Sequence, residues 1–200
     1  MAIGRITKLI EETIERMEIG EHVSFLPGEK HFFEKNFEPI EVRKGDYLIK
    51  RGSEVNYFYF LEEGIMKLSF PNSKGSDINA RFIQSREFIN FYLMHLDAHK
   101  AHYNIKANTH SKLWRMHKSR IQILFNQSLN FNKLARIHLE RSLQHRILRE
   151  ESIHCLNAQQ RYDRLMEKER WLFRHLPLKE LASYIGITPQ AFSKVRNKSK

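Results

Sequence analysis

The chain has 200 residues, of which 41% are hydrophobic and 28% are charged, and its formal net charge is +11. This composition is typical of a globular chain with one large or two small domains, and it excludes intrinsic disorder. The single cysteine excludes a disulfide framework or a four-cysteine metal site within one chain, and the absence of an 18-residue apolar run excludes a transmembrane helix. We therefore expect a cytoplasmic protein without a membrane partner.

The positive charge is concentrated in the second half of the sequence. Residues 111–200 hold 19 Lys/Arg and 7 Asp/Glu, a net charge of +12, whereas residues 1–110 hold 15 and 16, a net charge of −1. A basic half of this kind indicates an anionic partner such as nucleic acid. A lysine-rich, solvated helix surface would give the same composition, so charge alone leaves both interpretations open.

The first half of the chain is predicted to be mostly β-structure after an initial helix over residues 3–19. Short apolar runs alternate there with turn residues, and seven of the eight glycines lie at or before Gly75. The runs predict strands at Ile40–Val42, Tyr47–Ile49, Tyr57–Leu61, Ile65–Phe70, Ile78–Ile83, Tyr103–Thr109 and Lys112–His117. Many short strands with regular turns are typical of a barrel, sandwich or jelly roll.

The second half is predicted to be helical, which makes the order of elements segregated and favours an α+β fold. A short helix is expected at Ile121–Phe125, a long one from about 128 to 150, and another from 153 to about 170 with Cys155 buried. The long helix carries an apolar stripe of Phe131, Ala135, Leu139, Leu143 and Ile147. Such a stripe needs a partner, either the β-domain of the same chain or the same helix of a second subunit.

The segment from Leu178 to Asn197 has the pattern of a helix-turn-helix. Gly186 is expected to end the first helix in the left-handed conformation, and Thr188 to cap the second. Phe192 and Val195 would face inward, which leaves a polar outer face for the major groove of DNA. The candidate DNA-binding residues are Thr188, Gln190, Ser193, Lys194 and Arg196.

Each candidate has a role that follows from its donor and acceptor groups. Lys194 and Arg196 suit guanine or phosphate, and Gln190 suits adenine. The two hydroxyl residues are expected near the DNA backbone. The alternative is a helical hairpin packed in a core, although a core hairpin has no reason to keep so basic an outer face.

Residues 37–198 resemble the Crp/Fnr family of bacterial transcription regulators. The resemblance rests on the glycine turns of residues 44–52 and 57–64, which are similar to those of a cyclic-nucleotide-binding β-roll, on the long helix and on the helix-turn-helix. It implies a jelly-roll-like, antiparallel N-terminal β-roll with flanking helices over residues 1–117, a long dimerisation helix over 118–150 and an all-α helix-turn-helix domain over 151–200.

The resemblance also implies the partners. A homodimer would bind a palindromic site in double-stranded DNA, with half-sites about 34 Å apart. RNA polymerase is a further candidate partner.

The candidate effector site departs from the nucleotide-binding members of the family. Those members bind the ribose and cyclic phosphate with a Gly-Glu pair and, about ten residues later, an arginine with a serine or threonine. Here the pair falls on Asn90 and Phe91, and the arginine position falls on Ala101 or its neighbours Lys100 and His102. The ribose-binding carboxylate is therefore absent, and lysine lacks the bidentate fork of arginine, so cyclic AMP is not expected to be the ligand.

We expect no cofactor, and an effector of another kind or none. The candidate pocket residues are Phe88, Asn90, Phe91, Lys100 and His102. The aromatic members fit a hydrophobic core as well as they fit a ligand cage.

Two other functions stay open. His95, His99 and His102 would share one helical face, which would suit a metal-dependent enzyme, although structural histidines fit the same spacing and no metal site is expected. No enzyme motif is present, and the paired carboxylates Glu62 and Glu63 are expected in solvent on a hairpin turn. The other alternative is a small-molecule sensor that acts through protein contacts without reading DNA.

Overall fold

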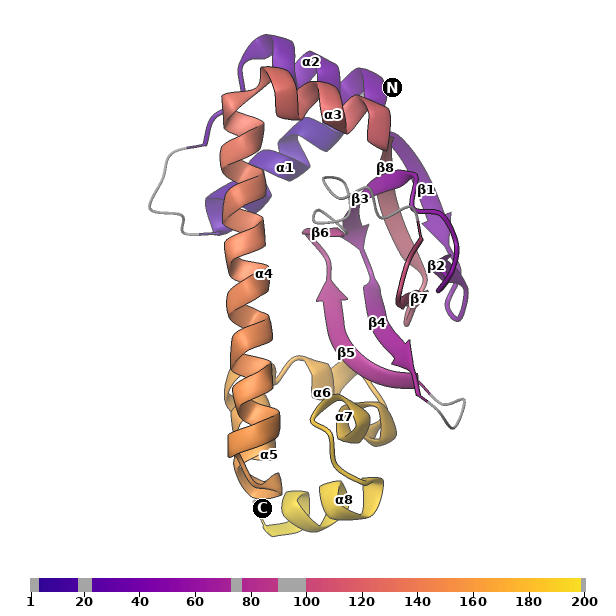
Figure 1. Cartoon of the computed structure of the whole chain (residues 1–200), viewed down its shortest axis with the longest axis vertical. Coiled ribbons are helices and arrows are strands. Elements are labelled where there is room, and N and C mark those ends of the chain that lie inside the picture. The colour runs from indigo at the N-terminus through magenta and orange to yellow at the C-terminus, as the bar shows by residue number, and fades with distance from the viewer. Residues whose placement is uncertain (1–3, 18–22, 73–76, 90–99, 199–200) are drawn as a thin grey trace. The chain divides into compact units, whose positions relative to one another are not determined.

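The computed structural model describes residues 4–17, 23–72, 77–89 and 100–198 (Figure 1). The helices are α1 (Arg5–Arg16), α2 (Pro27–Asn36), α3 (Lys118–Gln127), α4 (Leu129–Cys155), α5 (Ala158–Lys168), α6 (Leu172–His175), α7 (Leu178–Tyr184) and α8 (Pro189–Lys198). The strands are β1 (Glu38–Val42), β2 (Tyr47–Ile49), β3 (Tyr57–Glu63), β4 (Ile65–Pro71), β5 (Asp77–Gln84), β6 (Glu87–Ile89), β7 (Asn104–Ala107) and β8 (Ser111–His117).

The chain forms two compact units. The first comprises residues 1–68 and 82–141, and the second comprises residues 69–81 and 142–200. Strands β4 and β5 and helix α4 therefore each begin in one unit and end in the other. The three functional domains expected from the sequence stay a prediction, since packing alone defines these units.

Two four-stranded sheets form the predicted antiparallel roll, which is thereby confirmed. Their strand orders are β1-β8-β3-β6 and β2-β7-β4-β5. In the first sheet β3 lies antiparallel to β8, with Phe60 opposite Trp114. Gly64 turns the chain from β3 to β4 with a φ of 110°, and a side chain there would collide with the buried Ser111. Only glycine fits this turn without strain.

The core of the first unit is rich in aromatic rings. Phe58 stacks on Phe88, with ring centroids 5.5 Å apart, and Phe60 packs against the same ring at 5.0 Å. From α4, Phe131 meets the edge of Phe58 at 6.5 Å, and His138 meets the edge of Phe88 at 5.9 Å. These contacts fix the first half of α4 against the roll, because aromatic pairs add to the stabilisation given by area burial alone.

Helices α1, α2 and α3 pack near the start of α4 in the same unit (Figure 1). The Glu29 carboxylate of α2 accepts hydrogen bonds from Ser128 and Asn130, which ties α2 to that start. From α1, Arg5 forms an ion pair with Glu62, whose other oxygen accepts a hydrogen bond from Trp114 Nε1 at 2.7 Å. The expectation of a solvated Glu62 is therefore wrong, because two donors compensate the burial of its charge.

Further differences from the sequence-based expectation concern elements that were not predicted and the bounds of helices. Helix α2 and strand β6 were not predicted, and α4 runs on to Cys155, so the next helix begins only at Ala158. Asn157 sets that start, because its side chain accepts a hydrogen bond from the backbone N–H of Gln160 at 3.1 Å. Cys155 is exposed rather than buried, since it lies at the solvated end of α4.

The second unit has a small core made by its short helices. Leu172, Leu181 and Phe192 are fully buried there. The Phe192 ring of α8 packs edge-on against Tyr162 of α5, with centroids 5.4 Å apart. Helix α8 is therefore held by its inner face, which leaves the opposite face for other contacts.

Candidate nucleic-acid interface

The turn between α7 and α8 has the geometry expected from the sequence. Gly186 adopts a φ of 69°, in the left-handed region. The backbone N–H of Ile187 donates to the carbonyl of Ala182 at 3.0 Å, and the N–H of Gly186 donates to that of Ser183 at 3.2 Å. These bonds satisfy the last carbonyls of α7 and reverse the chain sharply. Ala182 is fully buried, which allows α7 and α8 to pack closely.

Helix α8 begins as predicted, with Thr188 before it and Pro189 as its first residue. The Thr188 hydroxyl oxygen accepts a hydrogen bond from the backbone N–H of Ala191 at 3.1 Å. Proline lacks a backbone N–H, but at the first helical position this costs no hydrogen bond, because the N–H of any residue there has no partner within the helix. Phe192 and Val195 are buried, at 0% and 8% exposure, so the inner face is the one expected from the sequence.

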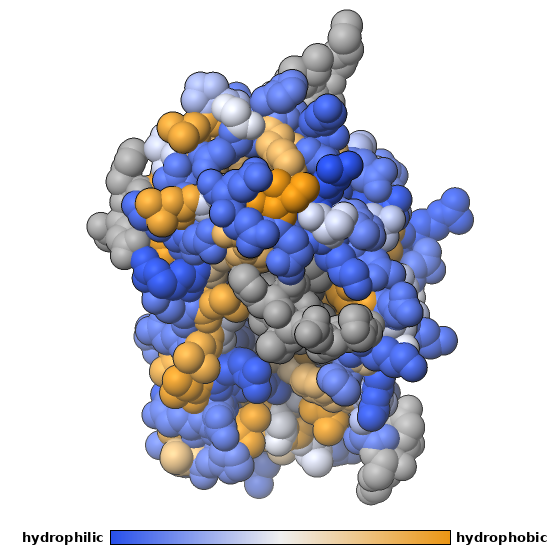
Figure 2. Space-filling model, turned by 45° about the horizontal axis from the view of Figure 1, so that its top comes forward, coloured by the Kyte–Doolittle hydropathy of each residue, from blue (hydrophilic) through white to orange (hydrophobic). Residues whose placement is uncertain are grey.

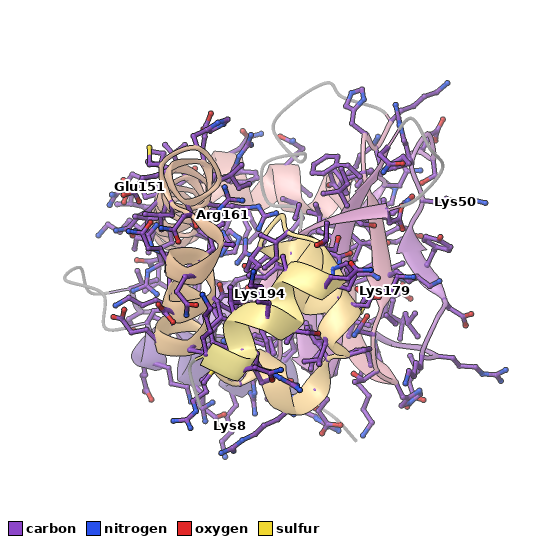
Figure 3. All side chains as sticks on the ribbon, turned by 90° about the horizontal axis from the view of Figure 1, so that it is seen from below. Lys8, Lys50, Glu151, Arg161, Lys179 and Lys194 are labelled. Atoms are coloured by element: carbon purple, nitrogen blue, oxygen red, sulfur yellow. The ribbon has the colours of Figure 1, made fainter. Side chains whose placement is uncertain are left out.

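The structure brings four of the five candidate DNA-binding residues together on the exposed face of α8 and at its start. Thr188, Gln190, Ser193 and Lys194 are exposed, whereas Arg196 is half-buried. The Arg196 Nε is buried and has no hydrogen-bond partner among the described residues. Figure 3 shows where Lys194 leaves α8 and where Lys179 leaves the neighbouring helix α7. Lysine, glutamine and hydroxyl groups on one exposed helix can donate to phosphates and base edges.

Arg161 of α5, which no sequence motif singled out, holds this turn in place. Its Nη1 donates to the carbonyls of Ile185 and Gly186 at 3.3 and 3.4 Å. Its Nε and Nη2 donate to the carbonyls of Leu156 and Ile153 at 2.9 and 2.6 Å. One cation therefore serves carbonyls at the ends of both α4 and α7, where helix dipoles favour positive charge. Arginine alone has enough donors for four such bonds.

The candidate effector residues are not brought together in the described part of the chain. Phe88 is a core residue, stacked on Phe58. Lys100 and His102 are exposed, and between them the buried Ala101 donates its N–H to the carbonyl of Ser53 at 2.9 Å. The remaining candidates, Asn90, Phe91, His95 and His99, lie outside the described residues. No cluster of three metal-ligating side chains occurs within the described ranges.

The apolar stripe of α4 divides into two parts. Phe131 and Ala135 are buried in the core of the first unit, and Leu139 is partly buried against it. Leu143 and Ile147 are exposed, at 59% and 56%. In Figure 2 hydrophobic surface gathers at the left of the view, the side on which Figure 1 draws α4. The core of the first unit therefore buries only the first part of the stripe.

Known proteins share parts of this sequence and this fold. Residues 39–128 match the cyclic nucleotide-binding domain family. No curated protein matches the sequence. The c-di-GMP responsive global regulator CLP of Xanthomonas campestris is similar in structure, with a TM-score of 0.71 at 16% identity, over 86% of this chain and 90% of that one. The chain has the fold of the Crp/Fnr regulators.

Two further solved structures share this fold. FixK2 of Bradyrhizobium japonicum has a TM-score of 0.71 at 13% identity, over 81% of this chain and 83% of that one. A transcriptional regulator of the Crp/Fnr family from Thermus thermophilus has a TM-score of 0.63 at 17% identity, over 80% and 84%. CLP is a global regulator, and the Thermus thermophilus protein is a transcriptional regulator. Of the helices described, none has the length and apolar character needed to span a membrane.

Proposed function

We propose that this protein is a dimeric transcription regulator that reads a specific DNA sequence and acts in the cytoplasm. The observation that carries the proposal is the exposed polar face of α8, presented by a helix whose inner face is locked by Phe192 and Val195. A helix fixed in this way can enter the major groove without unfolding its core. The net charge of +12 over residues 111–200 adds a sequence-independent attraction to phosphate.

The direct test is selection of bound duplexes from a random DNA pool at near-physiological salt. The proposal expects an enriched sequence with two-fold symmetry, because two identical subunits would present two identical recognition helices. Weak binding without an enriched sequence, lost as salt is raised, would contradict sequence-specific reading. It would favour the alternative, a sensor that acts through protein contacts.

The Lys194→Ala variant tests the assignment of α8 as the reading helix. If Lys194 contacts a base, its loss should cost about 1–3 kcal/mol on the matched duplex, and if it contacts phosphate, the salt slope should fall by about one. Lys168→Ala is the matched control, because Lys168 is an exposed lysine of the same unit on α5. Equal effects of the two substitutions would contradict the assignment.

The exposed half of the α4 stripe supports the dimer. Leu143 and Ile147 lie one turn apart on one face of α4, with Leu148, 50% exposed, beside them. Burying side chains of this kind against a second copy would contribute about 1.5–3 kcal/mol each. The double variant Leu143→Glu/Ile147→Glu should therefore sediment as a monomer at concentrations where the wild type is a dimer. Leu129→Glu, at a leucine that is 71% exposed on the first turn of α4, should leave the dimer intact.

We propose further that cyclic AMP does not control the protein. The position of the phosphate-binding arginine falls on Ala101, whose side chain is buried, with the exposed Lys100 and His102 on either side. None of these offers a guanidinium fork inside the roll. Titration calorimetry should show no micromolar binding of cyclic AMP, and such binding would overturn this part of the proposal. RNA polymerase stays a predicted partner.

A further inference from the structure

Strand β5 contributes a buried asparagine to the second unit. Asn79 is 2% exposed. Its side-chain Nδ2 donates to the carboxylate Oε2 of Glu180 at 2.6 Å and to the backbone carbonyl of the same residue at 3.1 Å. Its backbone N–H donates to the hydroxyl of Ser183 at 3.2 Å. One residue of β5 thus binds two successive turns of α7, the first helix of the helix-turn-helix.

An arginine of α4 completes this contact from the other side. Arg149 Nη2 donates to the backbone carbonyl of Asn79 at 2.8 Å, and its Nη1 donates to that of Tyr184 at 2.6 Å. The guanidinium also lies over the Tyr184 ring, 4.7 Å from its centroid. A positive charge at the C-terminal carbonyl of α7 is favourable because of the helix dipole.

The Tyr184 hydroxyl extends the contact to the residue that follows α5. Tyr184 is 3% exposed, and its hydroxyl donates to the Glu169 carboxylate at 3.0 Å. Burial and the nearby carboxylate raise the pKa of Tyr184, so the phenol stays protonated and remains a donor. Strand β5 and helices α4 and α7 are therefore joined through buried and half-buried polar groups whose hydrogen bonds are directional.

We propose that Asn79 is a positioning residue for DNA reading, and that strands β4 and β5 act as a strap that sets the position of α7. This inference rests on the function proposed above. Strand β5 continues from Asn79 to Phe82 and Ile83, which are buried, and the first segment of the second unit ends at Arg81. A shift of β5 along its length would pull Asn79 away from α7. The polar groups that it now satisfies would then lose these bonds, which is costly for buried groups.

The strap favours sequence-specific DNA binding because it orders the helix-turn-helix already in the free protein. Two recognition helices must meet two half-sites at a fixed spacing. Freedom of α7 relative to α4 would have to be lost on binding, and this loss would weaken binding to the matched site. Contacts to phosphate are less affected by such freedom, because they carry no sequence information.

The first experiment compares hydrogen exchange of the full-length chain with that of Asn79→Asp and Asn79→Ala. The aspartate would place a carboxylate against that of Glu180, so its effect should exceed that of alanine. We expect amides of residues 181–186 to exchange about tenfold faster in Asn79→Asp. Ile78→Ser is the control, because Ile78 is the preceding residue of β5 and is 47% exposed. It should leave the exchange of α7 unchanged.

A swapped pair separates a specific contact from general damage to folding. In Asn79→Asp/Glu180→Gln the amide and the carboxylate change places, so the side-chain bond can form again with the donor on α7. The double variant should recover part of the protection that Asn79→Asp loses. If the effects of the two single substitutions on α7 exchange simply add, with no recovery of protection, the proposed strap is wrong. It is also wrong if Asn79→Asp leaves the exchange of α7 unchanged.

The second experiment measures binding of the same variants to the matched palindrome and to unrelated DNA. Asn79→Asp should weaken binding to the palindrome at least about tenfold, with little change on unrelated DNA. Unchanged or tighter binding to the palindrome would overturn the positioning role. If the wild type selects no sequence at all, the proposed function fails, whereas the exchange experiment still reports whether β5 holds α7.

Discussion

The two units are stabilised by different means. The first is built around stacked aromatic rings and the buried faces of two sheets, with Phe58, Phe60 and Phe88 among its central residues. The second has a few apolar residues under short helices, and Asn79, Arg149 and Arg161 cross-link those helices through hydrogen bonds to backbone carbonyls. The comparison shows that a small helical unit can gain from directional polar contacts the order that a large core gains from packing.

The largest effect is expected in the aromatic core. Phe58→Ala should lower the free energy of unfolding by about 3–5 kcal/mol, because Phe58 is fully buried and its removal leaves a cavity beside Phe88. Urea unfolding followed by fluorescence measures this. Tyr47→Ala, at a ring that is 44% exposed in the same unit, should cost far less. Similar losses for the two variants would contradict a core centred on Phe58.

The next effect is expected at the polar cross-link of the second unit. Arg161→Lys should lower the free energy that protects α7 and α8 from opening by about 2 kcal/mol, because an ammonium cannot reach four carbonyls in two directions. Hydrogen exchange at α7 and α8 reports it. Arg170→Lys, at an exposed arginine, is the control. Exchange as slow as in the wild type would show that the hydrogen bonds of Arg161 add no stability.

A pH-dependent effect should appear in the second unit through His145. Burial first, and then the charges of Arg81 and Arg149, lower the pKa of His145 from 6.5 to about 4. Between these values the unfolded chain binds the proton and the folded unit does not, so stability is full above pH 6.5 and falls with the pH toward 4. The loss from pH 7 to pH 5 should be at most about 2 kcal/mol.

The variant His145→Gln should remove most of this dependence, because glutamine does not titrate. Thermal melting at pH 7 and pH 5 compares it with the wild type. His154→Gln changes an exposed histidine of the same helix and should keep the dependence. An identical pH dependence in wild type and His145→Gln would assign the effect to other groups.

The smallest effect is expected at the turn of the helix-turn-helix. Gly186→Ala should cost about 1–2 kcal/mol, because a side chain at a φ of 69° is strained and its Cβ would lie 3.4 Å from Arg161 Nη1. Gly186→Asn should cost less, since asparagine tolerates this conformation better. Chemical unfolding of the three proteins gives the order, and a cost for asparagine above that for alanine would contradict the strain argument.

Local sequence signals predicted the elements that depend on neighbouring residues. The strands follow apolar runs between glycine turns, and the helix-turn-helix follows from Gly186, Thr188 and the spacing of Phe192 and Val195. Helix α2 was missed although Pro27 begins it, and Glu29 in its first turn accepts a hydrogen bond from the backbone N–H of Leu26 at 2.7 Å. Strand β6 has only three residues, too few for a periodic pattern.

The contacts that organise the candidate site could not be predicted in this way. Asn79 and Glu180 are 101 residues apart, and Arg161 and Ile185 are 24 apart. Nothing near Asn79 in the sequence distinguishes it from a solvated strand residue, since its environment comes from α7 and α4. The exposure of Cys155 was mispredicted for a related reason, because an apolar neighbourhood in sequence does not show whether a helix end is covered.

The discontinuity of the second unit has a consequence for how the protein is made. Its residues 69–81 leave the ribosome well before α7, and at about 5–20 residues per second the 101 residues from Asn79 to Glu180 take roughly 5–20 s to synthesise. During that interval β5 carries an asparagine whose partners do not yet exist. A fragment that starts at residue 142 would be in the converse state, with α7 complete and its β5 partner missing. If the chain is cut before residue 142 and the two fragments are produced separately, neither fragment can form the hydrogen bonds between Asn79 and Glu180.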